Sequence, residues 1–319
     1  MQPVLEINNL TTTFFLRQGP VRAVDNVSLR LYQGKSLALV GESGCGKTML
    51  ALSILGLVPS PPGKITSGEV LFDGRDLTRL SEKELRAVRG NDISMIFQEP
   101  MSALNPVFRV GAQISETLIY HKKLSKNQAR EKGVELLKLV GIPAPEKRYN
   151  DFPHQLSGGM RQRVIIAMAL ACSPRIILAD EPTTALDVTI QAQILEIIRD
   201  LQDRSRTSTV LITHDLGVVA QVCHEMAVMY SGRVVEHGSV EDVLAGPRHP
   251  YTRGLLSSLP RLDREQDLEP IPGTVPEISN LPRGCPFHPR CPQKMPVCAE
   301  KEPPVFNTGS KVRCWLYHE

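Results

Sequence analysis

The chain has 319 residues, of which 41% are apolar and 22% are charged, and its formal net charge is +3. This length and apolar content allow a full hydrophobic core in one large domain or two smaller ones, which excludes a disordered or fibrous protein. The charges are spread along the chain rather than gathered in a tail, so the charge pattern argues against a nucleic-acid partner.

The first residues, "MQPVLEINNL", contain no basic stretch followed by an apolar run, so they predict no signal peptide. The longest uninterrupted apolar run, Val164 to Cys172, is well short of the ~20 residues that a membrane helix needs. We therefore expect a soluble, intracellular protein. In such a reducing compartment, clustered cysteines bind metal or do redox chemistry more often than they form structural disulfides.

The segment "GESGCGKT", from Gly41 to Thr48, fits the phosphate-loop pattern G-x-x-x-x-G-K-[ST]. It follows "SLALV" (36–40), which is typical of a short buried strand, and it precedes "MLALSILGL", which predicts an apolar helix. Lys47 is predicted to reach the β- and γ-phosphates, and the Thr48 hydroxyl to ligate Mg²⁺. Glycines let the backbone wrap around phosphates, and N–H groups at the helix start attract them. The other predicted nucleotide contacts of the loop are Gly41, Ser43, Gly44, Cys45 and Gly46.

The segment "LSGGMRQR", residues 156–163, precedes a second helix with apolar residues at helical spacing. Ser157 is a good N-cap, and Gly158 and Gly159 expose backbone N–H groups. The sequence therefore predicts a second helix start that can bind an anion.

Two carboxylates follow an apolar run in "RIILADEP", in which residues 176–179 precede Asp180 and Glu181. Such a run is typical of a parallel strand covered on both faces, which delivers the two acids to the sheet edge where ligands bind. Asp180 is predicted to hold the Mg²⁺ shell. Glu181 is predicted to polarise the attacking water as a general base.

Two phosphate-binding helix starts, "ALD" at 185–187, and His214 after the apolar strand "TVLIT" together resemble the ATP-binding-cassette (ABC) ATPases over about residues 4–240. In that family two cassettes pair head to tail, with each ATP between the phosphate loop of one and the LSGG signature of the other. The resemblance implies an α/β fold: a P-loop ATPase core with a mixed or parallel sheet, an N-terminal antiparallel β portion and a helical subdomain.

The resemblance also implies roles for single residues. Gln98 in "MIFQEP" would be the Q-loop residue that senses Mg²⁺ and water, and His214 would be the switch histidine. Asp187 would belong to the D-loop. The signature residues that contact the partner's ATP would be Ser157, Gly158 and Gly159. Phe14 would stack on adenine, with Phe15 as the alternative.

We expect an ATPase domain over residues 1–250, with the helical subdomain at about 100–160, and a small cysteine-rich extension over residues 251–319. The segment "PSPPGKITSG", residues 59–68, is typical of a surface loop. After Asp187, one apolar helical stripe predicts core packing. Its members are Ile190, Ile194, Ile197, Ile198 and Leu201.

The tail identifies the branch of the family. "PRHPYTRGLLSSLP" (247–260), "IPGTVP", the cysteines and "EPMSALNP" (99–106) resemble ATPases that drive bacterial dipeptide and oligopeptide import, together with nickel and some glycoside relatives. The resemblance implies a peripheral place on the cytoplasmic side of the membrane. The implied partners are a second ATPase subunit, as a paralogue or an identical copy, two membrane permease subunits, and an extracytoplasmic solute-binding protein.

Four cysteines lie within 30 residues of the tail: Cys285, Cys291, Cys298 and Cys314. Structural zinc sites usually contain a tight C-x2–4-C knuckle, and this spacing has none. Loose, proline-flanked thiolates suit an iron–sulfur cluster better, and the family resemblance implies a four-iron, four-sulfur (4Fe-4S) cluster. Zinc and no metal are the alternatives, and His288 could be a substitute ligand. Cys45, Cys172 and Cys223 need no metal, and Cys172 is predicted to be core.

Two other functions compete with transport. Cassette ATPases that act on DNA or the ribosome carry two cassettes, or a long coiled coil between phosphate loop and signature, whereas one cassette with an ordinary helical subdomain is present here. A cassette that pairs without hydrolysing ATP is the other rival, and the presence of Glu181 and His214 argues against it.

Overall fold

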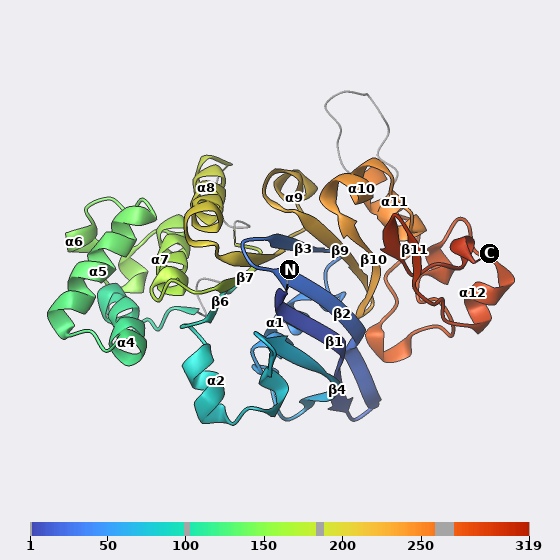
Figure 1. Ribbon diagram of the computed structural model, residues 1–319, viewed down its shortest axis with the longest axis horizontal. Coiled ribbons are helices and arrows are strands. Elements are labelled where there is room, and N and C mark those ends of the chain that lie inside the picture. The colour runs from blue at the N-terminus through green and yellow to red at the C-terminus, as the bar shows by residue number, and fades with distance from the viewer. Residues whose placement is uncertain (1, 99–102, 183–187, 259–270, 319) are drawn as a thin grey trace. The chain divides into compact units, whose positions relative to one another are not determined.

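The computed structural model describes residues 2–98, 103–182, 188–258 and 271–318. The chain forms two compact units, whose elements are labelled in Figure 1. The first unit takes its described residues from residue 2, 31–36 and 79–212, and the second from 3–30, 37–78 and 213–318.

The first unit contains a parallel sheet in the order β6-β7-β8, with the strands β6 (Ile93–Ile96), β7 (Ile176–Asp180) and β8 (Ser208–Ile212). Every residue of these three strands is buried, as expected for a parallel sheet covered on both faces. The helices of this unit are α2 (Glu82–Val88), α4 (Val110–Lys122), α5 (Lys126–Leu139), α6 (Pro145–Arg148), α7 (Gly158–Leu170) and α8 (Val188–Ser205).

Local sequence explains where several of these helices begin. Ser81 before α2 and Ser125 before α5 form capping boxes with Glu84 and Gln128, respectively, which satisfies backbone N–H groups of the first turn. In α8, Ile194 and Ile198 are buried, so the core reading of that apolar stripe is confirmed for these two members, while the side chain of Leu201 lies outside the described part.

The second unit begins with an antiparallel sheet in the order β2-β1-β4-β5. Its strands are β1 (Pro3–Leu16), β2 (Gly19–Tyr32), β4 (Gly63–Phe72) and β5 (Arg75–Asp76). The prediction of a surface loop over 59–68 was wrong for residues 63–68, because they pair with β1, from Ser67 opposite Thr11 to Gly63 opposite Phe14. Pairing with a distant strand outweighs the turn-forming composition of this segment.

The other sheet of the second unit is mixed, in the order β11-β12-β10-β9-β3. β3 is parallel to β9, and the other pairs are antiparallel. The strands are β3 (Ser36–Val40), which confirms the predicted strand, β9 (Glu225–Tyr230), β10 (Arg233–Ser239), β11 (Phe306–Thr308) and β12 (Ser310–Val312). The helices are α1 (Lys47–Ile54), α9 (Leu216–Val222), α10 (Val240–Ala245), α11 (Pro250–Ser257) and α12 (Pro296–Glu300).

The helix after the phosphate loop is shorter than the apolar run "MLALSILGL" indicated. Gly56 has a φ of +62°, its N–H donates to the Ser53 carbonyl, and the N–H of Leu57 donates to the Leu52 carbonyl. These two bonds form a Schellman motif, which a left-handed glycine permits. α1 therefore ends at Ile54 although apolar residues continue.

Residues of the C-terminal region share the hydrophobic core of the second unit. Tyr251 and Phe287 belong to one buried cluster with Val40, Val228 and Tyr230. The rings of Tyr230 and Tyr251 lie 4.7 Å apart between centroids, and those of Tyr230 and Phe287 lie 5.3 Å apart. The domain boundary at residue 250 remains a prediction, but the tail packs as part of this unit.

No helix within the described residues is both long and apolar enough to cross a bilayer.

Candidate active site

The phosphate loop lies between β3 and α1, and three of its glycines have positive φ: +152° at Gly41, +77° at Gly44 and +104° at Gly46. A Cβ at Gly41 would lie 2.3 Å from the Met229 carbonyl oxygen, and one at Gly46 would lie 2.3 Å from that of Ala23. Both close approaches require glycine. The loop backbone is thus pressed against neighbouring strands of its own unit.

Lys47 is 7% exposed, and its Nζ donates to the carbonyl oxygens of Gly41 at 2.7 Å and Glu42 at 3.0 Å. The ammonium is therefore held at the loop, where the phosphates of a nucleotide would need a positive charge. Thr48 is exposed in the first turn of α1, so its hydroxyl can reach a metal ion. Cys45 is buried, and burial raises the pKa of its thiol.

Glu42 contacts two residues of the C-terminal region that the sequence did not single out. Its backbone N–H donates to the Tyr251 hydroxyl at 2.8 Å. Its carboxylate accepts two hydrogen bonds from Arg290, from Nη1 at 2.8 Å and Nη2 at 3.0 Å. These bonds keep the pKa of Arg290 above its ordinary value. No local pattern could reveal this contact, because 248 positions separate the two residues.

In the first unit, Asp180 ends β7 and is 2% exposed. Glu181 follows with a φ of +45°. This left-handed backbone conformation is uncommon for residues other than glycine and recurs at functional sites. Gln98, just after β6, donates from Nε2 to the Glu181 carboxylate at 3.0 Å. The structure therefore brings the amide of the predicted Q-loop residue and the predicted general base together.

The signature residues begin α7. The Ser157 side chain accepts a hydrogen bond from the Met160 N–H at 3.3 Å, as predicted for an N-cap. Ser157 and Gly158 are exposed. The α7 side chain of Gln162 donates to the Pro182 carbonyl oxygen at 2.8 Å, which links this helix to the residue after Glu181.

The other predicted residues are placed as follows. His214 is exposed between β8 and α9. Phe14 is partly buried, with Gly63 beside its ring, whereas Phe15 is 57% exposed. Asp187 and the rest of "ALD" lie outside the described residues. Cys172 is 1% exposed, which confirms its core position.

The model of the family described as "ABC transporter" matches residues 24–184, and that of "Oligopeptide/dipeptide transporter, C-terminal region" matches residues 235–298. The dipeptide transport ATP-binding protein DppD of Bacillus subtilis is 53% identical over 99% of this chain and 95% of its own length. The oligopeptide transport ATP-binding protein OppD of the same organism is 53% identical over 99% of this chain and 89% of its own length.

A solved structure is similar as well. The dimeric post-hydrolysis structure of the ATP-binding cassette MJ0796 bound to ADP and Pi has a TM-score of 0.68 and 31% sequence identity, over 74% of this chain and 98% of that one. The chain therefore belongs to the ABC transporter ATPases, with the P-loop cassette fold, and it binds ATP with Mg²⁺ and hydrolyses it.

Two substitutions separate nucleotide binding from hydrolysis. Lys47→Ala is expected to abolish tight ATP binding, because it removes the positive charge at the phosphate loop. Glu181→Gln is expected to keep ATP binding but lower turnover by at least about 100-fold, because general-base catalysis is lost. Titration with ATP and phosphate release under single-turnover conditions measure the two effects. Near-normal hydrolysis by Glu181→Gln, at a site formed by this chain's own phosphate loop, would contradict the general-base assignment.

Proposed function

We propose that this chain is the ATP-hydrolysing subunit of a bacterial importer of dipeptides or oligopeptides. The observation that carries the proposal is the joining of an ABC cassette to a segment matching the C-terminal region of oligopeptide and dipeptide transporters. The relatives compared above are named for dipeptide and oligopeptide transport, which favours peptides over nickel as the solute.

The residues suit a Mg²⁺-dependent phosphoryl transfer to water. Mg²⁺ prefers hard oxygen donors, and the Thr48 hydroxyl, the Asp180 carboxylate and the Gln98 amide oxygen would supply them. The Mg²⁺ would neutralise charge that develops on the phosphates. Glu181 would accept the proton of the attacking water while Gln98 orients the carboxylate, and His214 would contact the γ-phosphate.

A second cassette would complete each ATP site. The exposure of Ser157 and Gly158 leaves the signature helix start open to a phosphate group carried by another subunit. A non-identical paralogue is the proposed partner, and an identical copy is the alternative.

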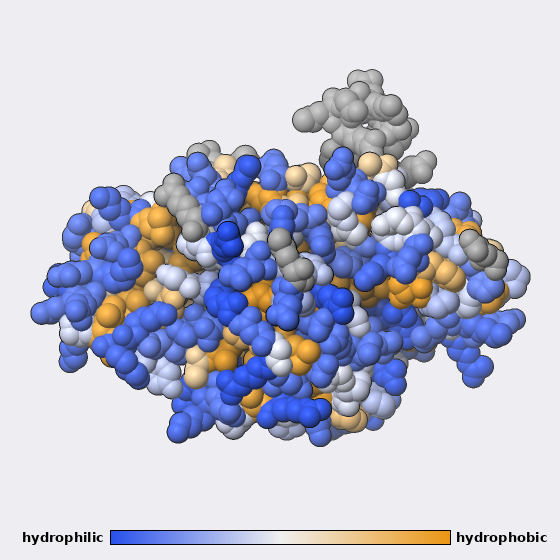
Figure 2. Space-filling model, viewed as in Figure 1, coloured by the Kyte–Doolittle hydropathy of each residue, from blue (hydrophilic) through white to orange (hydrophobic). Residues whose placement is uncertain are grey.

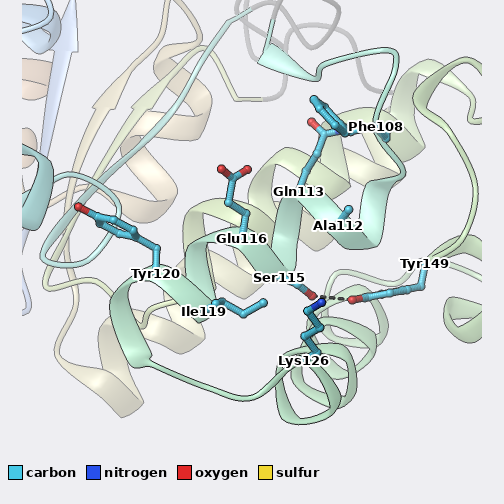
Figure 3. Close-up of a pocket in the computed structure, with 9 residues that line it drawn as sticks. All are labelled: Phe108, Ala112, Gln113, Ser115, Glu116, Ile119, Tyr120, Lys126 and Tyr149. Atoms are coloured by element: carbon cyan, nitrogen blue, oxygen red, sulfur yellow. Dashed lines mark hydrogen bonds between the residues drawn. The ribbon is translucent and has the colours of Figure 1, made fainter.

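The first unit carries a groove that could receive a permease segment (Figure 3). Its volume is ≈ 690 Å³, and α4 forms much of its wall. Phe108, Ile119 and Tyr120 line the groove and are 56%, 38% and 48% exposed, respectively. Apolar residues also show among hydrophilic ones over the α4–α7 region in Figure 2.

Such exposed apolar side chains favour a binding surface over an ordinary solvated face. We assign the groove to a short amphipathic helix of a permease, with an apolar face for Ile119 and a basic residue for Glu116. Because α4 follows Gln98 along the chain, a helix bound there could influence the Q-loop. The chain would then lie on the cytoplasmic face of the membrane as a peripheral subunit.

Isolation of the tagged chain from native membranes tests this assembly. We expect two permeases and a second cassette to copurify, and dipeptides or oligopeptides with their binding protein to stimulate ATP hydrolysis. Ile119→Glu should reduce permease recovery at least about fivefold, because it places a charge in the apolar groove, while ATP binding is unchanged. Lys132→Glu, on the exposed side of α5, is the control for a change toward negative charge, which it makes larger than Ile119→Glu does because it also removes a cation paired with Glu135. Copurification of nucleic acid or ribosomes instead would overturn the transport proposal.

We further propose that the four tail cysteines bind a 4Fe-4S cluster. All four are free thiols. The pKa of Cys285 and of Cys314 is raised to about 11, mainly by burial and in smaller part by the neighbouring cysteines. Two of the four are in direct contact, since the Cys285 N–H donates to the Cys298 carbonyl oxygen at 2.8 Å. Hydrogen bonds from backbone N–H groups act in the opposite direction and lower the pKa of three of the thiols. The pairs are Phe287 with Cys285, Gln293 with Cys291 and Leu316 with Cys314.

Within the ranges that the structure describes, no three His, Cys, Asp or Glu side chains form a group that could hold a metal ion. The four cysteines are therefore not arranged as a preformed site for a single ion. A four-iron cluster is larger than one ion, so it takes ligands that stand further apart, and hydrogen bonds to its sulfurs are typical. When bound, the cluster would supply folding energy to the tail through its four iron–thiolate bonds.

Anaerobic purification tests the cluster. We expect brown protein with iron and acid-labile sulfide in equal amounts, and loss of both when any one of the four cysteines is replaced by serine. Cys223→Ser, a matched change outside the tail, should leave the iron content unaltered. Zinc at full occupancy in protein made under iron-replete, oxygen-free conditions, or no metal at all, would refute the assignment.

A further inference from the structure

The C-terminal region contacts the phosphate loop of its own chain at Glu42. Arg290 binds its carboxylate through two hydrogen bonds, and Tyr251 accepts its backbone N–H. Arg290 and Tyr251 both lie outside the segment matching the ABC transporter family and inside the one matching the C-terminal region. All three residues belong to the second unit.

Contacts other than the one to Glu42 hold the Arg290 side chain in place. The residue is 6% exposed, its Nε donates to the Pro272 carbonyl oxygen at 3.0 Å, and its guanidinium lies 5.9 Å from the centre of the Tyr230 ring. A guanidinium fixed in this way presents its two Nη groups in the planar geometry that a carboxylate accepts. Arg290 can therefore fix the direction of the Glu42 side chain as well as its charge.

Tyr251 is equally constrained. It is fully buried in α11, and its ring packs against Tyr230 and against Phe287, with centroids 5.4 Å apart for the latter pair. Its hydroxyl is thus a fixed acceptor for the Glu42 N–H. Two rigid side chains from the C-terminal region hold one loop residue by both its backbone and its side chain.

Because Glu42 lies in the phosphate loop, its contact with Arg290 can affect phosphate binding. Glu42 follows Gly41 directly, and its carbonyl oxygen accepts a hydrogen bond from Lys47 Nζ. A carboxylate in a loop that binds phosphates would repel them, because like charges disfavour each other at short range. Arg290 neutralises that carboxylate and draws it toward the C-terminal region.

We propose that Arg290 and Tyr251 are positioning residues for the phosphate loop, through which the C-terminal region sets the ATP affinity of its own cassette. The proposal rests on the assignment of residues 41–48 as the ATP site. It makes the tail part of the nucleotide site, acting through Glu42 and without touching the nucleotide.

A double-mutant cycle on the full chain tests the proposal, with a fluorescent ATP analogue as the probe. Arg290→Gln should weaken nucleotide affinity roughly tenfold or more, because it leaves the Glu42 carboxylate unpaired beside the phosphates. In the Glu42→Gln background the same change should cost less than about threefold, because no carboxylate remains to be neutralised. Arg290→Lys, which keeps the charge and loses the fork, should lie between wild type and Arg290→Gln.

A purely structural role of Arg290 would give the same loss in both backgrounds, and that result would overturn the proposal, as would wild-type affinity in both Arg290 variants. Glu302→Gln is the control, since it removes another ion pair of the tail, to Arg233 at 2.7 Å, without contacting Glu42. It should leave affinity unchanged. Lys47→Ala distinguishes a failure of the ATP-site assignment from a failure of this inference. Normal binding of the probe by Lys47→Ala would contradict the assignment of the ATP site. Loss of binding in Lys47→Ala together with wild-type binding in Arg290→Gln would refute the role of Arg290 alone.

Discussion

A phosphate loop depends on backbone that can come closer to its surroundings than a side chain would allow. At Gly41 and Gly46 the approach is to the carbonyl oxygens of Met229 and Ala23, which lie on β9 and β2. Glycine at these two positions lets the loop press against strands of the same unit. The N–H groups and Lys47 can then face the phosphates. Glu42, in the same loop, is held by Tyr251 and Arg290.

The contacts of Glu42 connect the C-terminal tail to the phosphate loop. Tyr251, Phe287 and Arg290 surround Tyr230, which ends β9 just after Met229. The strand that packs against Gly41 therefore also carries Tyr230, against which the aromatic rings of the tail pack. Because Cys291 follows Arg290 directly, the proposed cluster would restrain the backbone next to this arginine. Ligand binding in the tail and nucleotide binding in the loop would then both depend on the packing around Tyr230.

The parts of the site that could be predicted are those determined by short stretches of sequence. The strand 36–40, the buried strand before Asp180 and the Ser157 N-cap follow from apolar runs and capping chemistry within a few residues. The strand over 63–68 was missed because its partner, β1, lies about fifty residues away. The Arg290–Glu42 pair was missed for the same reason, since an arginine and a glutamate far apart in sequence carry no signal of their contact.

The central claim, that the C-terminal region holds the phosphate loop, is tested most directly by hydrogen exchange at the Glu42 amide, whose acceptor is the Tyr251 hydroxyl. Tyr251→Phe removes that acceptor and keeps the ring. The account predicts that exchange at Glu42 becomes at least about tenfold faster in Tyr251→Phe, while amides of the buried strand β3 keep their protection. Equal protection of the Glu42 amide in wild type and Tyr251→Phe would contradict it.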